Sequence, residues 1–120
     1  MPTLASHAPI LPVKDIARAI AFYTQLGFSA EAYEDGEIYA FLTRDTLDIH
    51  LRKAPDLVEG NNPSGIYFYL ESGAAALEAE FRAAGVKILS PLEPRPWKMN
   101  EFMVSDPDGN LLRFGESLPK

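Results

Sequence analysis

Apolar residues recur along this chain with two different periods. After Asp15, a good helix N-cap residue, apolar positions return every three or four residues until Gly27, which predicts an amphipathic helix. Further on, Leu47 and Ile49 alternate with Asp48 and His50, which predicts a strand with one buried face. The positions of the helical pattern are Ile16, Ala19, Ile20, Phe22 and Tyr23.

The same reading gives an ordered set of elements along the whole chain. The proline-interrupted segment 8–13 is predicted as an edge strand, and the polar segment 53–64 is the only candidate linker. The turn residues 106–110 join the last two predicted strands. Further predicted strands are 28–33, 38–42, 47–51, 65–70 and 86–89, with a second helix over 74–84 closed by Gly85 and a proline-rich loop over 91–98.

This order repeats within the chain. The residues leading to Gly27 resemble those leading to Gly85, an offset of 58 residues. We therefore predict one α+β domain made of two βαβββ modules, about 1–58 and 59–120, whose sheets pack together to enclose a core. At 120 residues such a domain would gain from pairing with a second copy.

Composition narrows the classes of partner. The net charge is −6, and the few basic residues do not cluster, so neither nucleic acid nor an anionic membrane is expected to bind. No apolar run approaches the roughly 20 residues of a membrane span, and no signal-peptide pattern begins the chain. The absence of cysteine removes thiolate catalysis and disulfides and fits a cytoplasmic protein.

Several short motifs give the chain a family resemblance. With them it resembles the vicinal oxygen chelate superfamily and, within it, the bleomycin resistance proteins, over nearly its whole length. The resemblance implies paired βαβββ modules that form a cupped sheet, and a homodimer with clefts at the subunit interface. The motifs are Val13-Lys14-Asp15 before Ala21-Phe22-Tyr23, then Leu26-Gly27-Phe28, Pro96-Trp97, Glu101-Phe102 and the run from Asp106 to Phe114.

Metal-dependent members of the superfamily take His or Glu ligands from four strands. The corresponding positions here fall at Ala8, His50, Gly65 and Arg113. Only His50 is a possible ligand, because alanine and glycine offer no donor atom and an arginine cannot bind a metal. His7 lies one residue from the first position and would face the other way without a bulge. We therefore expect no metal site and no cofactor.

The resemblance implies a site for binding a ligand without a reaction. In bleomycin resistance proteins the tryptophan of the Pro-Trp motif, here Trp97, stacks on the planar tail of the drug. From composition alone, a lid over the core is the favoured interpretation, and the resemblance reverses that preference. The opposing aromatic is expected at Ala32, so Tyr33 would have to replace it after a register slip. Candidate ligand-binding residues are Trp97, Tyr33, Tyr39, His50, Glu34, Asp35, Phe102 and Arg113, with Tyr67 and Tyr69 as further aromatic candidates and an ion pair from Arg113 to Glu101 or Asp48 as the alternative role for that arginine.

The predicted function is non-catalytic sequestration of a cationic, bleomycin-like antibiotic. Acidic residues before and within the second turn would attract the positive tail of such a drug, although from the residues alone a solvated charged rim is the favoured interpretation. No glycine-rich phosphate loop or nucleophile elbow occurs. The alternatives are a metal-dependent glyoxalase-like lyase or dioxygenase of the same fold, using His50, His7 and an acid, and a binder of another aromatic metabolite.

Overall fold

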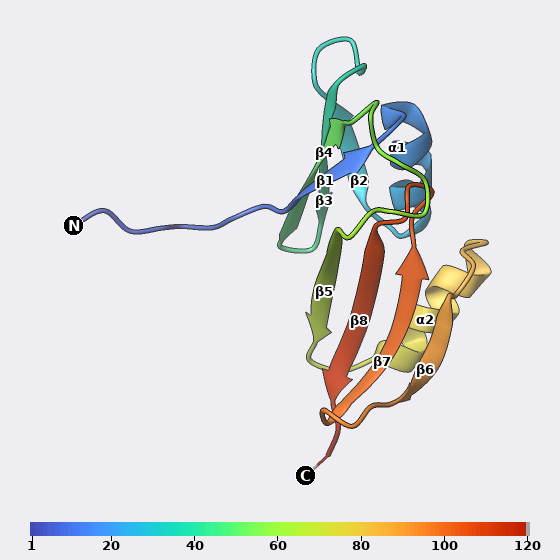
Figure 1. The fold of residues 1–120 in the computed structure, drawn as a ribbon. Coiled ribbons are helices and arrows are strands. Elements are labelled where there is room, and N and C mark those ends of the chain that lie inside the picture. Colours follow the sequence, from blue (N-terminus) through green and yellow to red (C-terminus); the bar gives the residue numbers. More distant parts are fainter. Residues whose placement is uncertain (120) are drawn as a thin grey trace.

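The structure is a computed structural model that describes residues 1–119, and it contains two four-stranded mixed sheets, each covered by one helix (Figure 1). The α+β class is confirmed. The elements are β1 Ile10–Val13, α1 Ile16–Gln25, β2 Ser29–Ala32, β3 Tyr39–Arg44, β4 Leu47–Lys53, β5 Gly65–Leu70, α2 Ala74–Ala83, β6 Ser90–Pro94, β7 Met99–Ser105 and β8 Leu111–Ser117.

The two sheets have the same topology. Sheet A has the strand order β1-β4-β3-β2, and sheet B has the order β5-β8-β7-β6. In each sheet the first strand pairs in parallel with the last, and the remaining pairs are antiparallel. Each half is therefore a βαβββ unit. The division of the chain near residue 58 into two modules stays a prediction.

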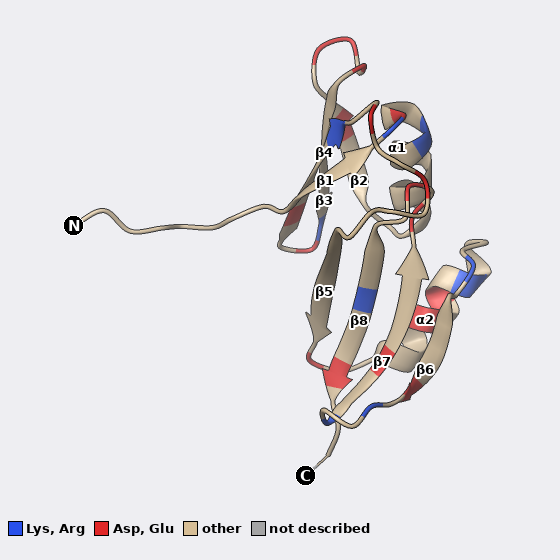
Figure 2. Ribbon diagram, viewed as in Figure 1, with Lys and Arg blue, Asp and Glu red and all other residues tan. Residues whose placement is uncertain are grey.

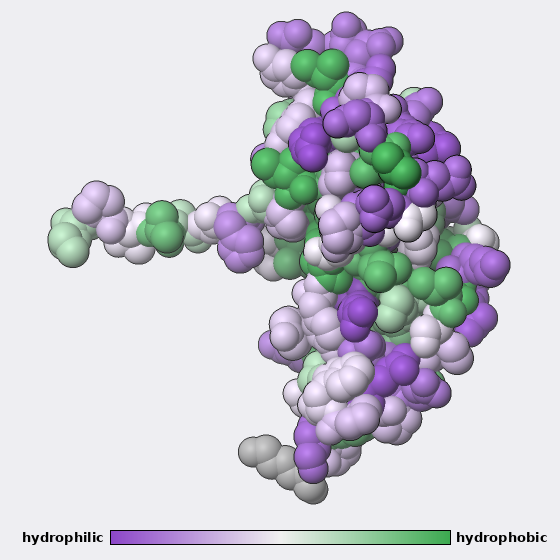
Figure 3. All heavy atoms as spheres, viewed as in Figure 1, coloured by the Kyte–Doolittle hydropathy of each residue, from purple (hydrophilic) through white to green (hydrophobic). Residues whose placement is uncertain are grey.

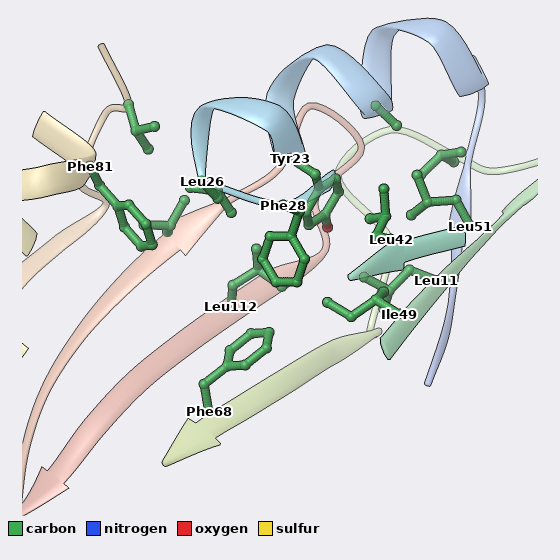
Figure 4. Packing of buried hydrophobic residues seen from close by; sticks show 14 of the residues in the cluster. Leu11, Tyr23, Leu26, Phe28, Leu42, Ile49, Leu51, Phe68, Phe81 and Leu112 are labelled. Atoms are coloured by element: carbon green, nitrogen blue, oxygen red, sulfur yellow. The ribbon is translucent and has the colours of Figure 1, made fainter. Parts of the chain in front are cut away.

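One hydrophobic core runs through both halves. Its members come from α1, α2 and the helix-facing side of both sheets, and Figure 4 shows Phe28 close to Leu112 and Phe68 across the junction. Phe114 stacks between Phe68 and Phe102, with its ring centroid 4.7 Å from that of Phe68 and 5.1 Å from that of Phe102. Fully burying one such side chain stabilises a fold by roughly 1.5–3 kcal/mol. The core ties the two sheets together because residues of both, such as Ile49 of sheet A and Leu112 of sheet B, belong to one buried cluster.

A buried polar cluster also joins the halves. The Tyr23 hydroxyl of α1 donates to Asp106 at 2.8 Å, and the Asn110 amide donates to the carbonyl of Pro12 in β1 at 2.9 Å and to Asp106 at 2.7 Å. Burial raises the pKa of Asp106, although hydrogen bonds from Asn110 and Tyr23 oppose that shift. The turn predicted over 106–110 therefore also links the two halves of the chain through buried hydrogen bonds.

One predicted strand is misplaced. Residues 86–89 form no strand, and β6 lies instead at Ser90–Pro94, inside the predicted proline-rich loop. The amide of Val86 is taken by the carbonyl of Phe81 at the end of α2. β6 is an edge strand with a register irregularity between Ser90 and Glu93, which is where a sheet accepts proline.

The beginning of the chain also differs from the prediction. β1 begins at Ile10, two residues after the predicted start, because Pro9 has no amide to donate, although its carbonyl accepts from His50. Residues 1–7 are exposed and belong to an extended arm that projects from the body (Figures 1 and 3). Within residues 1–119, no helix is long and apolar enough to cross a membrane.

Candidate ligand-binding surfaces

Four ring-bearing side chains gather on the face of sheet A that points away from α1. Phe41 of β3 pairs in register with His50 of β4, and their ring centroids are 5.0 Å apart. The Tyr39 hydroxyl lies 2.9 Å from Nδ1 of His50. Tyr33 completes the group, with its ring centroid 6.4 Å from that of Phe41. We call these four residues the sheet A aromatic surface.

The ring of Tyr33, and not the side chain of Ala32, lies on the face where the resemblance expects the second stacking aromatic. Ala32 is paired with Ala40, a buried residue on the helix side of β3, so its methyl group lies on the wrong face for stacking. The amide of Tyr33 bonds to the carbonyl of Tyr39, and its ring sits with Phe41 on the opposite face. With 44% of its surface exposed, Tyr33 is open to a ligand.

Acidic residues border this surface. Glu34 and Asp35 lie in the exposed loop between β2 and β3, directly after Tyr33 (Figure 2). Glu34 adopts a left-handed backbone with φ of 51°, and Asp35 accepts a hydrogen bond from the amide of Glu37. The loop places negative charge at one end of the aromatic surface, where it would attract a cation.

Trp97 lies on sheet B, in the tight turn that joins β6 and β7. Hydrogen bonds from Arg95 N to Met99 O and from Lys98 N to Arg95 O close the turn, and Lys98 holds a left-handed φ of 71°. Trp97 is 54% exposed. It therefore does not act as a lid over the core, and its ring is accessible as a platform.

A buried carboxylate lies beside Trp97. Glu101 of β7 is only 1% exposed, and its Oε1 accepts hydrogen bonds from the Tyr67 hydroxyl at 2.7 Å and from the Trp97 indole at 3.2 Å. Tyr67 in turn lies 4.8 Å from Tyr69, centroid to centroid. Burial, and then the hydrogen bond and charge of Glu101, raise the pKa of Tyr67 to about 12. We call Tyr67, Tyr69, Trp97 and Glu101 the sheet B platform.

Arg113 lies next to this platform on β8 and is half-buried. Its register neighbours are Tyr67 on β5 and Met103 on β7, and with Tyr67 it lines a hollow of about 380 Å³. No ion pair joins it to Glu101 or Asp48 within residues 1–119, which corrects the ion-pair prediction. Arg95 instead approaches Glu101, with its Nε 3.9 Å from Oε2. Arg113 therefore remains a candidate for ligand contact.

Phe102 does not belong to either surface. Its ring is fully buried, stacked on Phe114 and edge-on to Phe81 of α2. Because neighbouring strand residues face opposite ways, Glu101 points to the platform while Phe102 points into the core. The prediction of Phe102 as a ligand-binding residue is therefore corrected to a supporting role in the core.

The four positions that hold metal in related enzymes do not make a metal site here. Gly65 is required by packing, because a Cβ there would lie 2.7 Å from the carbonyl oxygen of Leu111. His7 lies in the exposed arm and lines a hollow with Asp48 and Ile49. Within residues 1–119, no group of three or more His, Asp or Glu side chains could hold a metal ion. The donor set thus does not fit a catalytic metal.

The two surfaces do not face each other within one chain. A hollow of about 500 Å³ under the N-terminal arm is lined by Tyr67 and Tyr69 of sheet B and by Asp48 of sheet A, among others, but by none of the four rings of the sheet A aromatic surface. Within residues 1–119, each aromatic pair on these two surfaces joins rings of the same sheet. One chain therefore presents two separate aromatic surfaces.

Two functional candidates escaped the sequence analysis. Phe41 was read only as part of a strand, although its alternation with Tyr39 places both rings on one face. Glu101 was named as a motif residue and as a partner for Arg113. Nothing in the sequence could show that it lies under Trp97 and Tyr67, because that contact depends on the turn over 95–98.

Comparison with known proteins shows the family and the fold. A bleomycin resistance protein from Geobacillus stearothermophilus is 34% identical over 129 aligned residues, covering 92% of this chain and 95% of that protein, and a Staphylococcus aureus bleomycin resistance protein matches equally. Among solved structures, a bleomycin-binding protein complexed with bleomycin superposes with a TM-score of 0.83 at 23% identity, covering 95% of this chain and 99% of the other.

A second solved structure, the bleomycin resistance determinant encoded on the transposon Tn5, also has a TM-score of 0.83 at 23% identity, with 95% of this chain and 98% of the other covered. TioX from Micromonospora sp. ML1 has a TM-score of 0.76 at 22% identity, with 95% and 100% covered. These likenesses establish the fold. The profile of the Glyoxalase/Bleomycin resistance protein/Dioxygenase superfamily matches residues 5–114, and the chain belongs to that superfamily.

Proposed function

We propose that this protein binds a cationic, aromatic-bearing glycopeptide antibiotic of the bleomycin type and sequesters it unchanged. The observation that carries the proposal is the exposed ring of Trp97, held on sheet B in a chain that is 34% identical to bleomycin resistance proteins. A planar heteroaromatic group stacking on an indole gains apolar burial and a favourable ring-ring contact. No reactive group is needed for that.

Charge supports the same ligand class. Glu34 and Asp35 border the sheet A aromatic surface, and the protein carries a net charge of −6. A cationic ligand is drawn toward such a field, and its charge is further stabilised over ring faces. The proposal excludes nucleic acid and anionic membranes as partners for the same electrostatic reason.

We further propose that the functional unit is a homodimer with its clefts at the subunit interface. A planar ligand stacks best when rings cover both of its faces, but Tyr33 and Trp97 lie on different sheets that do not face each other in one chain. A second copy could bring the sheet A aromatic surface of one protomer opposite the sheet B platform of its partner. Each dimer would then hold two such clefts.

Protection follows from mass action in the cytoplasm, where we place the protein. Drug held by an excess of tight-binding protein is not free to act, and the free fraction falls with the ratio of protein concentration to dissociation constant. No turnover is required. The level of protection should therefore scale with the amount of protein expressed.

Growth of expressing cells in bleomycin tests this proposal. Cells that produce the natural chain should grow at higher drug concentrations than cells that produce Trp97→Ala. Trp97 is half exposed, so this change should leave the fold intact while weakening binding about tenfold or more. Leu89→Ala, which removes an apolar side chain of similar exposure that belongs to neither aromatic surface, is the comparison variant.

Two further readouts separate binding from chemistry. Bleomycin recovered from the denatured complex should have its original mass, and protein purified without chelators should contain no stoichiometric nickel, zinc or iron. Altered drug, or a stoichiometric metal, would replace this proposal with an enzyme of the same fold. Equal protection by Trp97→Ala and the natural chain would show that Trp97 of the sheet B platform does not contribute to drug binding.

A further inference from the structure

We infer that Glu101 is a positioning residue for Trp97: its buried carboxylate fixes the indole ring so that the ring face is presented to the ligand. This inference rests on the proposed function for its effect on drug binding, although its structural part can be tested without any drug. It starts from an unusual placement. Glu101 is a carboxylate in the middle of β7 with only 1% of its surface exposed.

A buried carboxylate persists only when its oxygens are compensated. Here Oε1 accepts from two aromatic donors, the Tyr67 hydroxyl at 2.7 Å and the Trp97 indole at 3.2 Å. The Arg95 guanidinium lies nearby, with its Nε 3.9 Å from Oε2 and its NH2 group bonded to the Glu101 carbonyl at 3.4 Å. Both donors to Oε1 belong to the sheet B platform.

The platform would be loosely held without this carboxylate. Trp97 lies in a hairpin turn and is half exposed, so packing alone restricts its ring weakly. The hydrogen bond that the indole N–H donates to Glu101 fixes the tilt of the ring. Ordering the ring before binding removes an entropy cost that a free side chain would incur on immobilisation.

The same contacts define what the platform can recognise. The Trp97 N–H and the Tyr67 O–H are both directed to Glu101, so neither donor remains for the ligand. What remains outward is the π face of each ring, above a negatively charged carboxylate. Such a surface favours a planar group that is cationic or electron-poor over one that needs hydrogen-bond donors.

Trp97 is the only tryptophan of the chain, which makes the inference directly measurable. Its indole N–H gives a single resonance in a nitrogen-proton NMR spectrum. In the free natural protein we expect that proton to exchange with water at least about tenfold more slowly than the indole proton of a small tryptophan peptide, because it is bonded to a carboxylate. Exchange at the peptide rate would overturn the inference without any variant.

Variants separate positioning from a general structural effect. Glu101→Met removes the acceptor at similar size, and we expect lower fluorescence anisotropy of Trp97 and about 3- to 10-fold weaker bleomycin binding. Glu101→Gln keeps an acceptor oxygen and should recover most of the anisotropy. Glu93→Gln is the matched control, because Glu93 is the register neighbour of Glu101 and bonds Arg95 at 2.8 Å without touching Trp97.

A double-mutant comparison closes the test. In a Trp97→Phe background, which keeps a ring but has no N–H, Glu101→Met should change bleomycin affinity less than about twofold. An equal loss in both backgrounds would show that Glu101 acts by another route and would overturn the inference. If the natural chain binds no bleomycin, the proposed function fails, while the exchange and anisotropy measurements still decide the role of Glu101.

Discussion

Tyr67 shows how a neighbouring charge changes the chemistry of one side chain. Burial together with the hydrogen bond and charge of Glu101 raises the pKa of its phenol to about 12 from the ordinary value of 10.0. The folded protein therefore holds this proton more tightly than the unfolded chain. The resulting stability is fully present below pH 10 and is lost as the pH rises through about 12.

This pKa gives a testable dependence of stability on pH. Between pH 9 and pH 12, the free energy of unfolding of the natural protein should fall more than that of Tyr67→Phe, by roughly 2 kcal/mol at most. Denaturant unfolding at several pH values would measure the difference. Parallel curves for the two proteins would show that the Tyr67 phenol is not coupled to Glu101.

Single residues also mark where sequence reasoning reached its limit. The family register placed the second stacking aromatic at Ala32, but Ala32 lies opposite Ala40 on the helix side, and Tyr33 reaches the aromatic surface. The choice between the two depends on where β2 ends, and no local pattern in four exposed residues specifies that end. His50 and Tyr39, in contrast, lie on strands with clear alternation, so their face was predictable.

The turn between β7 and β8 joins elements from both halves of the chain. Asn110 is fully buried there, and its amide links Asp106 of the turn to the carbonyl of Pro12 in β1. Its own Oδ1 accepts from Asn62 in the segment between the two sheets. Removing one partner of these hydrogen bonds should lower the stability of the fold, because the polar groups left behind are buried and unpaired.

Replacing Asn110 by alanine should therefore lower the free energy of unfolding by about 1–3 kcal/mol. The matched control is Asn61→Ala, since Asn61 is exposed and its amide side chain makes no hydrogen bond within residues 1–119. That change should cost less than about 0.5 kcal/mol. Equal effects of the two substitutions in thermal or denaturant unfolding would show that the hydrogen bonds of Asn110 do not stabilise the contact between the two halves.

The close approach of β5 to β8 at Gly65 leads to a further prediction about stability. Gly65 stands at a position where related enzymes hold a metal, but a Cβ there would lie 2.7 Å from the Leu111 carbonyl oxygen on the paired strand β8. Gly65→Ala should destabilise the fold by about 1–3 kcal/mol, because backbone must move to admit the methyl group. Stability unchanged in chemical denaturation would mean that the two strands adjust freely.

Elements with strong periodic patterns were predictable from the sequence, whereas β6, the irregular edge strand of sheet B, was not. Asp15 caps α1 as predicted, accepting a hydrogen bond from the amide of Arg18, and α2 begins at the predicted Ala74. β6 was missed because it contains Pro91 and Pro94, which ordinarily indicate a loop. Its place at the edge of sheet B, which makes these prolines acceptable, is a property of the whole sheet.

The proposed homodimer gives a role to the two separate aromatic surfaces of one chain. The duplicated topology was predictable from the repeat around Gly27 and Gly85, whereas the separation of the two surfaces was not, because it depends on how the sheets pack. In solution the protein should therefore have a mass of about twice 13.3 kDa by light scattering. A chain that binds bleomycin while remaining a monomer would contradict the shared cleft.

The most direct test of the account is a calorimetric titration of the metal-free protein with metal-free bleomycin. We predict saturable heat, one drug per chain as two symmetric clefts require, and affinity about tenfold or more weaker for Trp97→Ala. Binding should also weaken as salt is added, because attraction of a cation by the acidic rim is screened. No saturable heat with the natural chain at micromolar concentrations would contradict the central claim that this protein sequesters such a drug.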